Sequence, residues 1–162
     1  MKLSIEIDAP SALWRGLPRA RALARETVAA CLLEVGFKPP PGAELSLRLT
    51  DDAEMRKLNA RWRGQDEATN VLSFPAASTE TAAGPPILGD IALAYETLLR
   101  EARLSGVLLA DHYRRLVAHG FLHLIGYDHQ TDGEAERMED LERRILARLG
   151  VGDPYPGRTV ER

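Results

Sequence analysis

The sequence predicts an α+β fold: a single domain in which a mixed four-stranded sheet packs with about five helices. Two observations predict this fold. Short apolar stretches that alternate like strands recur between longer stretches with helical periodicity. No internal repeat and no long linker interrupts the 162 residues, a length that suits one core. We therefore expect residues 1–162 to form one domain.

The first half of the chain alternates strands with helices. Residues 3–7 alternate like a strand, and residues 18–35 have the periodicity of an amphipathic helix that Gly36 and the following prolines end. Residues 45–49 alternate leucine with polar residues, which indicates a second strand. Asp51 offers the N-cap of a helix that runs to about residue 61.

The second half begins with a strand pair. Residues 71–74 form a short strand that ends at Pro75, and residues 87–94 return as a strand, antiparallel to the first. Between them, residues 76–86 are small, polar and turn-rich, which predicts a mobile loop. Three helices complete the chain, at residues 95–104, at 107–125 and from Thr131 to Leu149.

The segment from His119 to His129 is the strongest functional signal. It holds three of the four histidines of the chain. Residues four apart share one face of a helix, so His119 and His123 can offer two ring nitrogens to one ion. Gly126 can adopt the left-handed conformation that ends a helix, and His129 can then return as a third ligand. Three histidines and one open position are typical of catalytic zinc, so we expect one Zn²⁺ on a helix and the turn after it.

The spacing is also that of the extended zinc motif of metzincin proteases, with one difference. Those enzymes carry glutamate directly after the first histidine, as general base for the attacking water. Here that position is Gly120. The metal-binding spacing is kept, but the usual peptidase base is missing.

The segment HGFLHLIGYDH closely resembles the signature of the YbeY family of bacterial rRNA maturation factors. Residues 58–75 resemble the central block of that family, and residues 88–91 resemble its following strand. The stretch from Met138 to Gly150 also fits, so the resemblance covers most of residues 45–155. Two departures are visible in the central block: Ala68-Thr69-Asn70 stands where Pro-Thr-Asp is expected, and Trp62 where tyrosine is common.

The resemblance implies a metal-dependent, single-strand-specific endoribonuclease. It implies a role in rRNA processing, namely 16S rRNA 3′ end maturation, and in ribosome quality control. The implied partners are single-stranded or ribosomal RNA and the small ribosomal subunit with its associated proteins. Arg63 matches an arginine held important for activity in the family. Chemically, its guanidinium could clamp a phosphate and offset charge in the transition state.

Four other residues are considered as candidates for a chemical role. Asp128 could accept a hydrogen bond from the free ring N–H of a histidine ligand, or it could cap the turn. Tyr127 is expected to pack, and His112 to lie at the surface or the rim of the site. Cys31, the only cysteine, is expected to be a small buried apolar residue. The last helix carries an acidic face that we expect to be solvated, formed by Glu134, Glu136, Glu139, Asp140 and Glu142.

Composition limits the class of protein but does not identify a nuclease. The formal net charge of −3 gives no global support for RNA binding. No apolar run approaches the roughly 20 residues of a membrane span, and the N-terminus lacks the apolar core of a signal peptide. We therefore expect a cytoplasmic protein without a membrane partner.

Two other functions stay open from the sequence. One is a small zinc peptidase or other hydrolase, and the other is a non-catalytic ribosome assembly factor with a structural metal. Three imidazoles also suit nickel, copper or iron. A catalytic metal can polarise a phosphoryl oxygen or lower the pKa of a bound water. The sequence does not choose between water and the 2′-hydroxyl of RNA as nucleophile, because it offers no obvious general base.

Overall fold

The four strands form where side chains alternate in sequence. The computed structural model describes residues 3–76 and 86–152. Within them the strands are β1 (Leu3–Asp8), β2 (Ala43–Thr50), β3 (Val71–Pro75) and β4 (Ile87–Ala94). Along β2, every second side chain is buried, from Ala43 to Leu49. The predicted strands are confirmed, each to within about two residues.

The sheet is mixed, as predicted. Its strand order is β1-β2-β4-β3. The β1–β2 and β2–β4 pairs are parallel, whereas β3 runs antiparallel to β4 and pairs Leu72 with Ala92. Among the described residues β3 is therefore an edge strand of the sheet.

Five α-helices are present in the described part of the chain. They are α1 (Ala20–Val35), α2 (Asp52–Arg63), α3 (Tyr95–Ser105), α4 (Leu109–Leu124) and α5 (Asp132–Arg148). A short 3-10 helix, η1 (Ala12–Gly16), precedes α1 and was not predicted. α1 begins at Ala20 rather than at Pro18, which lies in the turn between the two helices.

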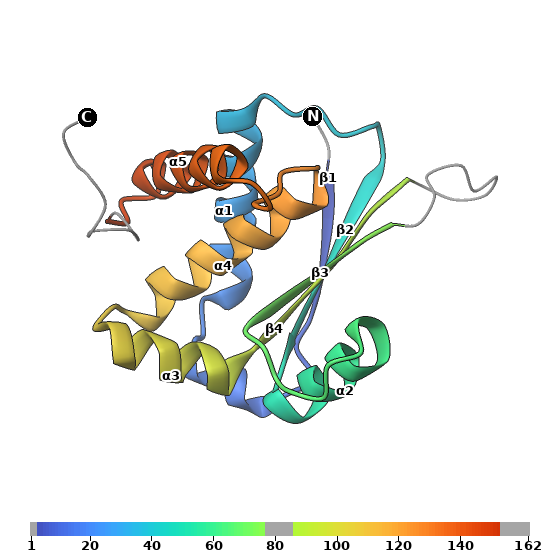
Figure 1. Cartoon of the computed structure of the whole chain (residues 1–162), viewed down its shortest axis with the longest axis vertical. Helices are drawn as coiled ribbons and strands as arrows, with labels where there is room; N and C mark the ends of the chain where they lie inside the picture. The colour runs from blue at the N-terminus through green and yellow to red at the C-terminus, as the bar shows by residue number, and fades with distance from the viewer. Residues whose placement is uncertain (1–2, 77–85, 153–162) are drawn as a thin grey trace.

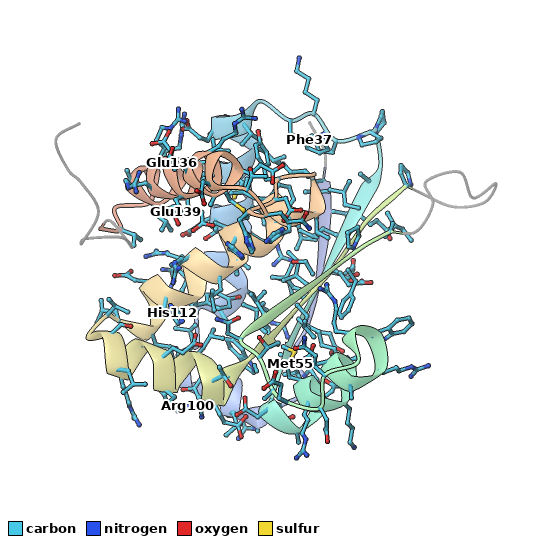
Figure 2. All side chains as sticks on the ribbon, in the orientation of Figure 1. Phe37, Met55, Arg100, His112, Glu136 and Glu139 are labelled. Carbon is cyan, nitrogen blue, oxygen red and sulfur yellow. The ribbon has the colours of Figure 1, made fainter. Side chains whose placement is uncertain are left out.

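The helices divide unequally between the two faces of the sheet. Figure 1 shows α1, α3, α4 and α5 on one side of the sheet and α2 on the other. The main hydrophobic cluster lies under the four helices and includes Leu47, Ile91, Phe121 and Ile145, each at most 1% exposed. On the opposite face, Met55 points from α2 toward the sheet (Figure 2) and packs near Leu72. These layers make an α+β domain.

Capping fixes the ends of the helices that border the site. The Asp51 carboxylate accepts a hydrogen bond from the Glu54 backbone N–H at 2.9 Å, so α2 begins where predicted. α2 ends at Arg63 because Gly64 adopts φ 71°, in the left-handed region that glycine tolerates. α5 begins with a capping box between Thr131 and Glu134.

Two single-residue predictions can be compared with burial. Cys31 is fully buried, and this burial raises the pKa of its thiol, which confirms an apolar packing role. The prediction that His112 lies at the surface or rim is wrong: it is 8% exposed and lies 2.8 Å from the Glu101 carboxylate of α3. Figure 2 shows His112 on α4, which packs against α3.

Two further predictions concern loops and membranes. The loop predicted for residues 76–86 falls mostly on residues 77–85, which lie outside the described residues. Among the helices of residues 3–76 and 86–152, none is long and apolar enough to cross a bilayer.

Candidate metal centre

α4 brings the first two histidines of the motif together. His119 and His123 lie one turn apart near the C-terminal end of α4, on the same helical face. Their Nε2 atoms are 3.2 Å apart. The predicted pairing of these two side chains is therefore present in the structure.

The turn after α4 adds the third histidine. Gly126 has φ 108°, a backbone conformation that side chains rarely adopt, and it lets the chain reverse after Ile125. One ring nitrogen each from His119, His123 and His129 then lies within 4.8 Å of the others. His119 and His123 are half-buried, whereas His129 is exposed. The group is thus open to solvent on the side of His129.

The donor set fits a metal ion with nitrogen ligands. Two nitrogens bound to a tetrahedral zinc at about 2.0–2.1 Å are separated by about 3.3–3.4 Å. The His119–His123 separation of 3.2 Å is close to this value. Three neutral imidazoles can hold such an ion and leave one position open. The three histidines could therefore bind a metal ion, and their geometry alone does not select which metal.

The electrostatics of His123 favour the form that binds metal. Burial, followed by the neighbouring rings of His119 and His129, lowers the pKa of His123 below its ordinary value. A neutral imidazole has a free lone pair, whereas a protonated one has none. As the pH falls, His123 therefore stays neutral, and able to bind a metal, at pH values where an exposed histidine is already protonated.

Glu142 of α5 contacts the candidate metal centre, and the prediction that it is solvated is wrong. It is 1% exposed, and its Oε2 lies 2.6 Å from Nδ1 of His119. Met138 and Leu141, which are also buried, lie on the same inward face of α5. The helix turns Glu142 toward α4 and leaves Glu134 and Glu136 exposed.

Asp128 contacts a backbone N–H and not a histidine ring nitrogen. Its Oδ1 accepts a hydrogen bond from the backbone N–H of His129 at 2.7 Å. This bond holds the turn that carries His129. The sequence left two roles open for Asp128, as a support for a histidine ligand or as a cap of the turn, and its contact is the one expected of a cap. The carboxylate that contacts a histidine ring is that of Glu142. Tyr127 packs against the main hydrophobic cluster, as expected.

Gly120 lies on the face of α4 that packs against the sheet. A Cβ added there would lie 3.0 Å from Ser73 Oγ and 3.1 Å from Ile91 Cγ2. Ser73 also donates a hydrogen bond from Oγ to the Gly120 carbonyl at 3.0 Å. Glycine at this position lets α4 approach β3 and β4 closely. The absence of a glutamate here thus has a packing reason in addition to its chemical consequence.

A pocket of about 590 Å³ opens in front of the histidines. Its wall includes all three histidines and Asp128, together with residues of β3. Arg63, at the end of α2, reaches it from the other side of the sheet edge. Its Nη2 donates to the Ser73 carbonyl at 2.7 Å, and its guanidinium carbon lies 5.6 Å from the centre of the Phe74 ring. The structure thus brings Arg63 and the three histidines to one pocket.

Arg115 also lines the pocket and was missed by the sequence analysis. It lies four residues before His119 on α4, and its Nε is 3.9 Å from Glu142 Oε1. Its spacing to His119 was a usable signal, because helical periodicity places both on one face. Glu142 had no such signal, since its contact with His119 spans 23 positions.

Comparison with known proteins identifies relatives along most of the chain. The model of the family described as "Endoribonuclease YbeY" matches residues 16–150. A protein of that name from Azorhizobium caulinodans is 49% identical over 142 residues, which cover 88% of this chain and 89% of the relative. Another, from Methylocella silvestris, is 46% identical over 155 residues, which cover 96% of this chain and 87% of the relative.

The fold has a solved counterpart. The solution structure of TM1509 from Thermotoga maritima superimposes with a TM-score of 0.56, and the match covers 98% of this chain and 99% of that one. At 21% identity, this likeness concerns the fold alone.

Proposed function

The chain belongs to the YbeY endoribonuclease family, and from that membership we propose that it cleaves single-stranded RNA with one Zn²⁺ held by His119, His123 and His129. Family membership makes it a nuclease of rRNA processing. The observation that carries the proposed site is the convergence of three ring nitrogens on one pocket.

The cellular role follows from the same membership. We propose that the substrate is the 3′ end of 16S rRNA, and that the protein also serves ribosome quality control. Its partners would then be the small ribosomal subunit and the proteins bound to it, and its compartment the cytoplasm. We assign this activity to residues 1–162 as one domain.

The pocket residues have complementary tasks toward a phosphodiester. Zinc, when bound, would polarise a phosphoryl oxygen or acidify a water molecule. Arg63 presents a planar guanidinium that is suited to a phosphate, and its bond to the Ser73 carbonyl limits its freedom. Arg115 offers a second cation on the α4 side of the pocket. The two arginines would orient the RNA backbone and offset the charge that develops on phosphorus.

The other two functions have less support. A peptidase with this motif requires a glutamate after the first histidine, whereas this chain has Gly120, where an added Cβ would lie only 3.0 Å from Ser73 Oγ and 3.1 Å from Ile91 Cγ2. A purely structural metal is usually closed by four protein ligands, whereas one of these three histidines is exposed beside a pocket. Both observations favour the nuclease.

The test measures metal content and RNA cleavage on the same protein samples. We expect the wild type to contain one equivalent of zinc and to cut single-stranded RNA. In His123→Ala we expect zinc content to fall below a tenth of an equivalent and cleavage to disappear, because two histidines hold zinc weakly. The chemical form of the RNA ends distinguishes the two nucleophiles: attack by the 2′-hydroxyl leaves a cyclic phosphate, and attack by water does not.

His112→Gln is the matched control. It changes the remaining histidine of the chain, which lines a different pocket, and it should retain both zinc and cleavage. Zinc binding without cleavage of several RNAs, even with ribosomal subunits present, would favour the assembly factor. Turnover of a peptide that a chelator abolishes would favour the peptidase. Absence of metal from the wild type would contradict the proposed site.

A further inference from the structure

A buried carboxylate connects α5 to the candidate metal centre. Glu142 is 1% exposed, although it is charged. A carboxylate at such burial costs folding free energy unless hydrogen bonds and opposite charges compensate for lost hydration. One oxygen of Glu142 lies 2.6 Å from His119 Nδ1, and the other lies 3.9 Å from Arg115 Nε. The side chain thus contacts one metal-ligand candidate and one cation of the pocket wall.

The contact with His119 defines which ring nitrogen carries the proton. An ionised carboxylate only accepts hydrogen bonds, so with Glu142 ionised the Nδ1 of His119, 2.6 Å away, has to be the donor. In the neutral ring, Nε2 then keeps its lone pair. That atom is the one that lies 3.2 Å from His123 Nε2, on the side where the three donors converge. The hydrogen bond therefore selects the tautomer that can bind metal.

We propose that Glu142 is a positioning residue of the metal centre, which holds His119 in its metal-binding tautomer and orientation and holds Arg115 at the pocket wall. The inference rests on the proposed metal binding by the three histidines. It goes further because it assigns a task to Glu142, which lies 23 positions after His119 in the sequence. It also makes α5 part of the site rather than a covering helix.

The alternatives for this task are weaker. Asp128 lies next to His129 in sequence, yet its Oδ1 accepts the backbone N–H of that residue. Glu136, labelled on α5 in Figure 2, belongs to the same helix as Glu142 but is exposed. In the described part of the chain, Glu142 is the carboxylate for which a hydrogen bond to a ring nitrogen of the three histidines is found.

Zinc affinity tests the proposal without measuring RNA cleavage. We would titrate metal-free wild type, Glu142→Gln and Glu136→Gln with zinc in competition with a chelator of known affinity. Loss of a carboxylate that supports a histidine ligand typically weakens metal binding by about 10- to 100-fold. We expect that loss in Glu142→Gln. Glu136→Gln removes the same charge from an exposed position of the same helix and should bind zinc as the wild type does.

A second readout separates positioning from a general structural role. In metal-free protein, ¹⁵N NMR of the imidazoles reports which nitrogen of His119 is protonated. We expect one tautomer in the wild type, with the proton on Nδ1, and a mixture in Glu142→Gln. Glu142→Asp restores the charge on a side chain one methylene shorter, so it should recover part of the zinc affinity. It also carries the test if Glu142→Gln does not fold, as judged by circular dichroism.

The outcomes distinguish this proposal from the proposed function. A wild type that binds no zinc overturns the proposed metal centre. A wild type that binds zinc, together with a folded Glu142→Gln of equal affinity and the same His119 tautomer, overturns the role of Glu142 alone.

Discussion

Arg63 combines exposure with a fixed geometry, which makes it the most direct single-residue test of phosphate binding. Its guanidinium is tied to the Ser73 carbonyl and lies over the Phe74 ring. If it orients the phosphate, Arg63→Ala should lower kcat/KM for RNA cleavage about 100-fold or more, as loss of a transition-state donor does elsewhere. The kcat/KM of Arg63→Lys should lie between those of Arg63→Ala and the wild type, because lysine keeps the charge but lacks the planar guanidinium that can contact two phosphate oxygens. Initial rates on a short single-stranded RNA would measure this.

Arg61 provides the matched control for that prediction. It lies on the same helix and contacts the ring of Trp62, 5.3 Å from its guanidinium carbon, away from the pocket. Arg61→Lys should leave cleavage within about twofold of the wild type. Zinc content should stay at one equivalent in all of these variants. Equal cleavage by Arg63→Ala and the wild type would remove Arg63 from the proposed mechanism.

Arg63 was predicted from the family resemblance, whereas the other residues of the candidate site were predictable where a local period fixed their geometry. His119 and His123 met that condition because helical spacing places them on one face, and Gly126 marked the reversal that returns His129. Glu142 did not, since it belongs to a run of acidic residues along α5 of which Glu134 and Glu136 are exposed, and only tertiary packing of the helix buries it. Polar residues that become buried by tertiary contact have no periodic signal of their own.

Among the elements, α4 is constrained from two sides. Its polar edge carries the histidines, while Gly120 on another face lets it approach β3 and β4. Gly120→Ala gains helix propensity worth about 1 kcal/mol. It also places a methyl group 3.0–3.1 Å from Ser73 and Ile91, and such overpacking typically costs about 1–3 kcal/mol. We expect a net loss of about 1 kcal/mol in the free energy of unfolding, measured by urea denaturation of the metal-free protein.

Gly133 allows the gain in helix propensity from a glycine-to-alanine change to be measured without overpacking. It lies in the first turn of α5, where an added Cβ would meet nothing within 4 Å. Gly133→Ala should therefore be neutral or stabilise by up to about 1 kcal/mol. If both variants shifted stability in the same favourable direction, close packing of α4 on the sheet would not be the reason for Gly120.

Element positions were more predictable than element ends. Alternation and helical periodicity located all four strands and five helices of the described residues, because burial on one face imposes those periods. The start of α1 was misplaced, since the prediction took Pro18 as the first residue of the helix and had no pattern to detect η1. Short 3-10 turns have too few residues for a period to be visible.

At the scale of the whole molecule, net charge describes the candidate pocket poorly. The chain carries a formal charge of −3, yet its candidate pocket has Arg63 and Arg115 in its wall beside three histidines. A bound divalent cation would add two further positive charges at the same place. Local potential rather than total charge steers a polyanion to such a cleft. This explains why composition alone did not indicate a nuclease.

The candidate metal centre also joins α4, the turn after it and α5, and this has a consequence for stability. His119 and His123 lie on α4, His129 on the turn after it, and Glu142 on α5, which packs against both α4 and α1. An ion that binds the folded state and not the unfolded one stabilises it by about 2.7 kcal/mol at a hundred times its dissociation constant. For a domain of this size, that corresponds to a rise in Tm of about 5–10 °C.

We therefore expect zinc to raise the Tm of metal-free wild type by this amount and to leave His123→Ala within about 1 °C. Differential scanning calorimetry at two zinc concentrations would measure the shift, which should grow with concentration as mass action requires. Glu142→Gln should respond only at about 10- to 100-fold higher zinc, because its expected defect is in affinity. An equal shift in Tm in the wild type and His123→Ala would mean that zinc binds elsewhere on the protein. That result would contradict a zinc site formed by the three histidines.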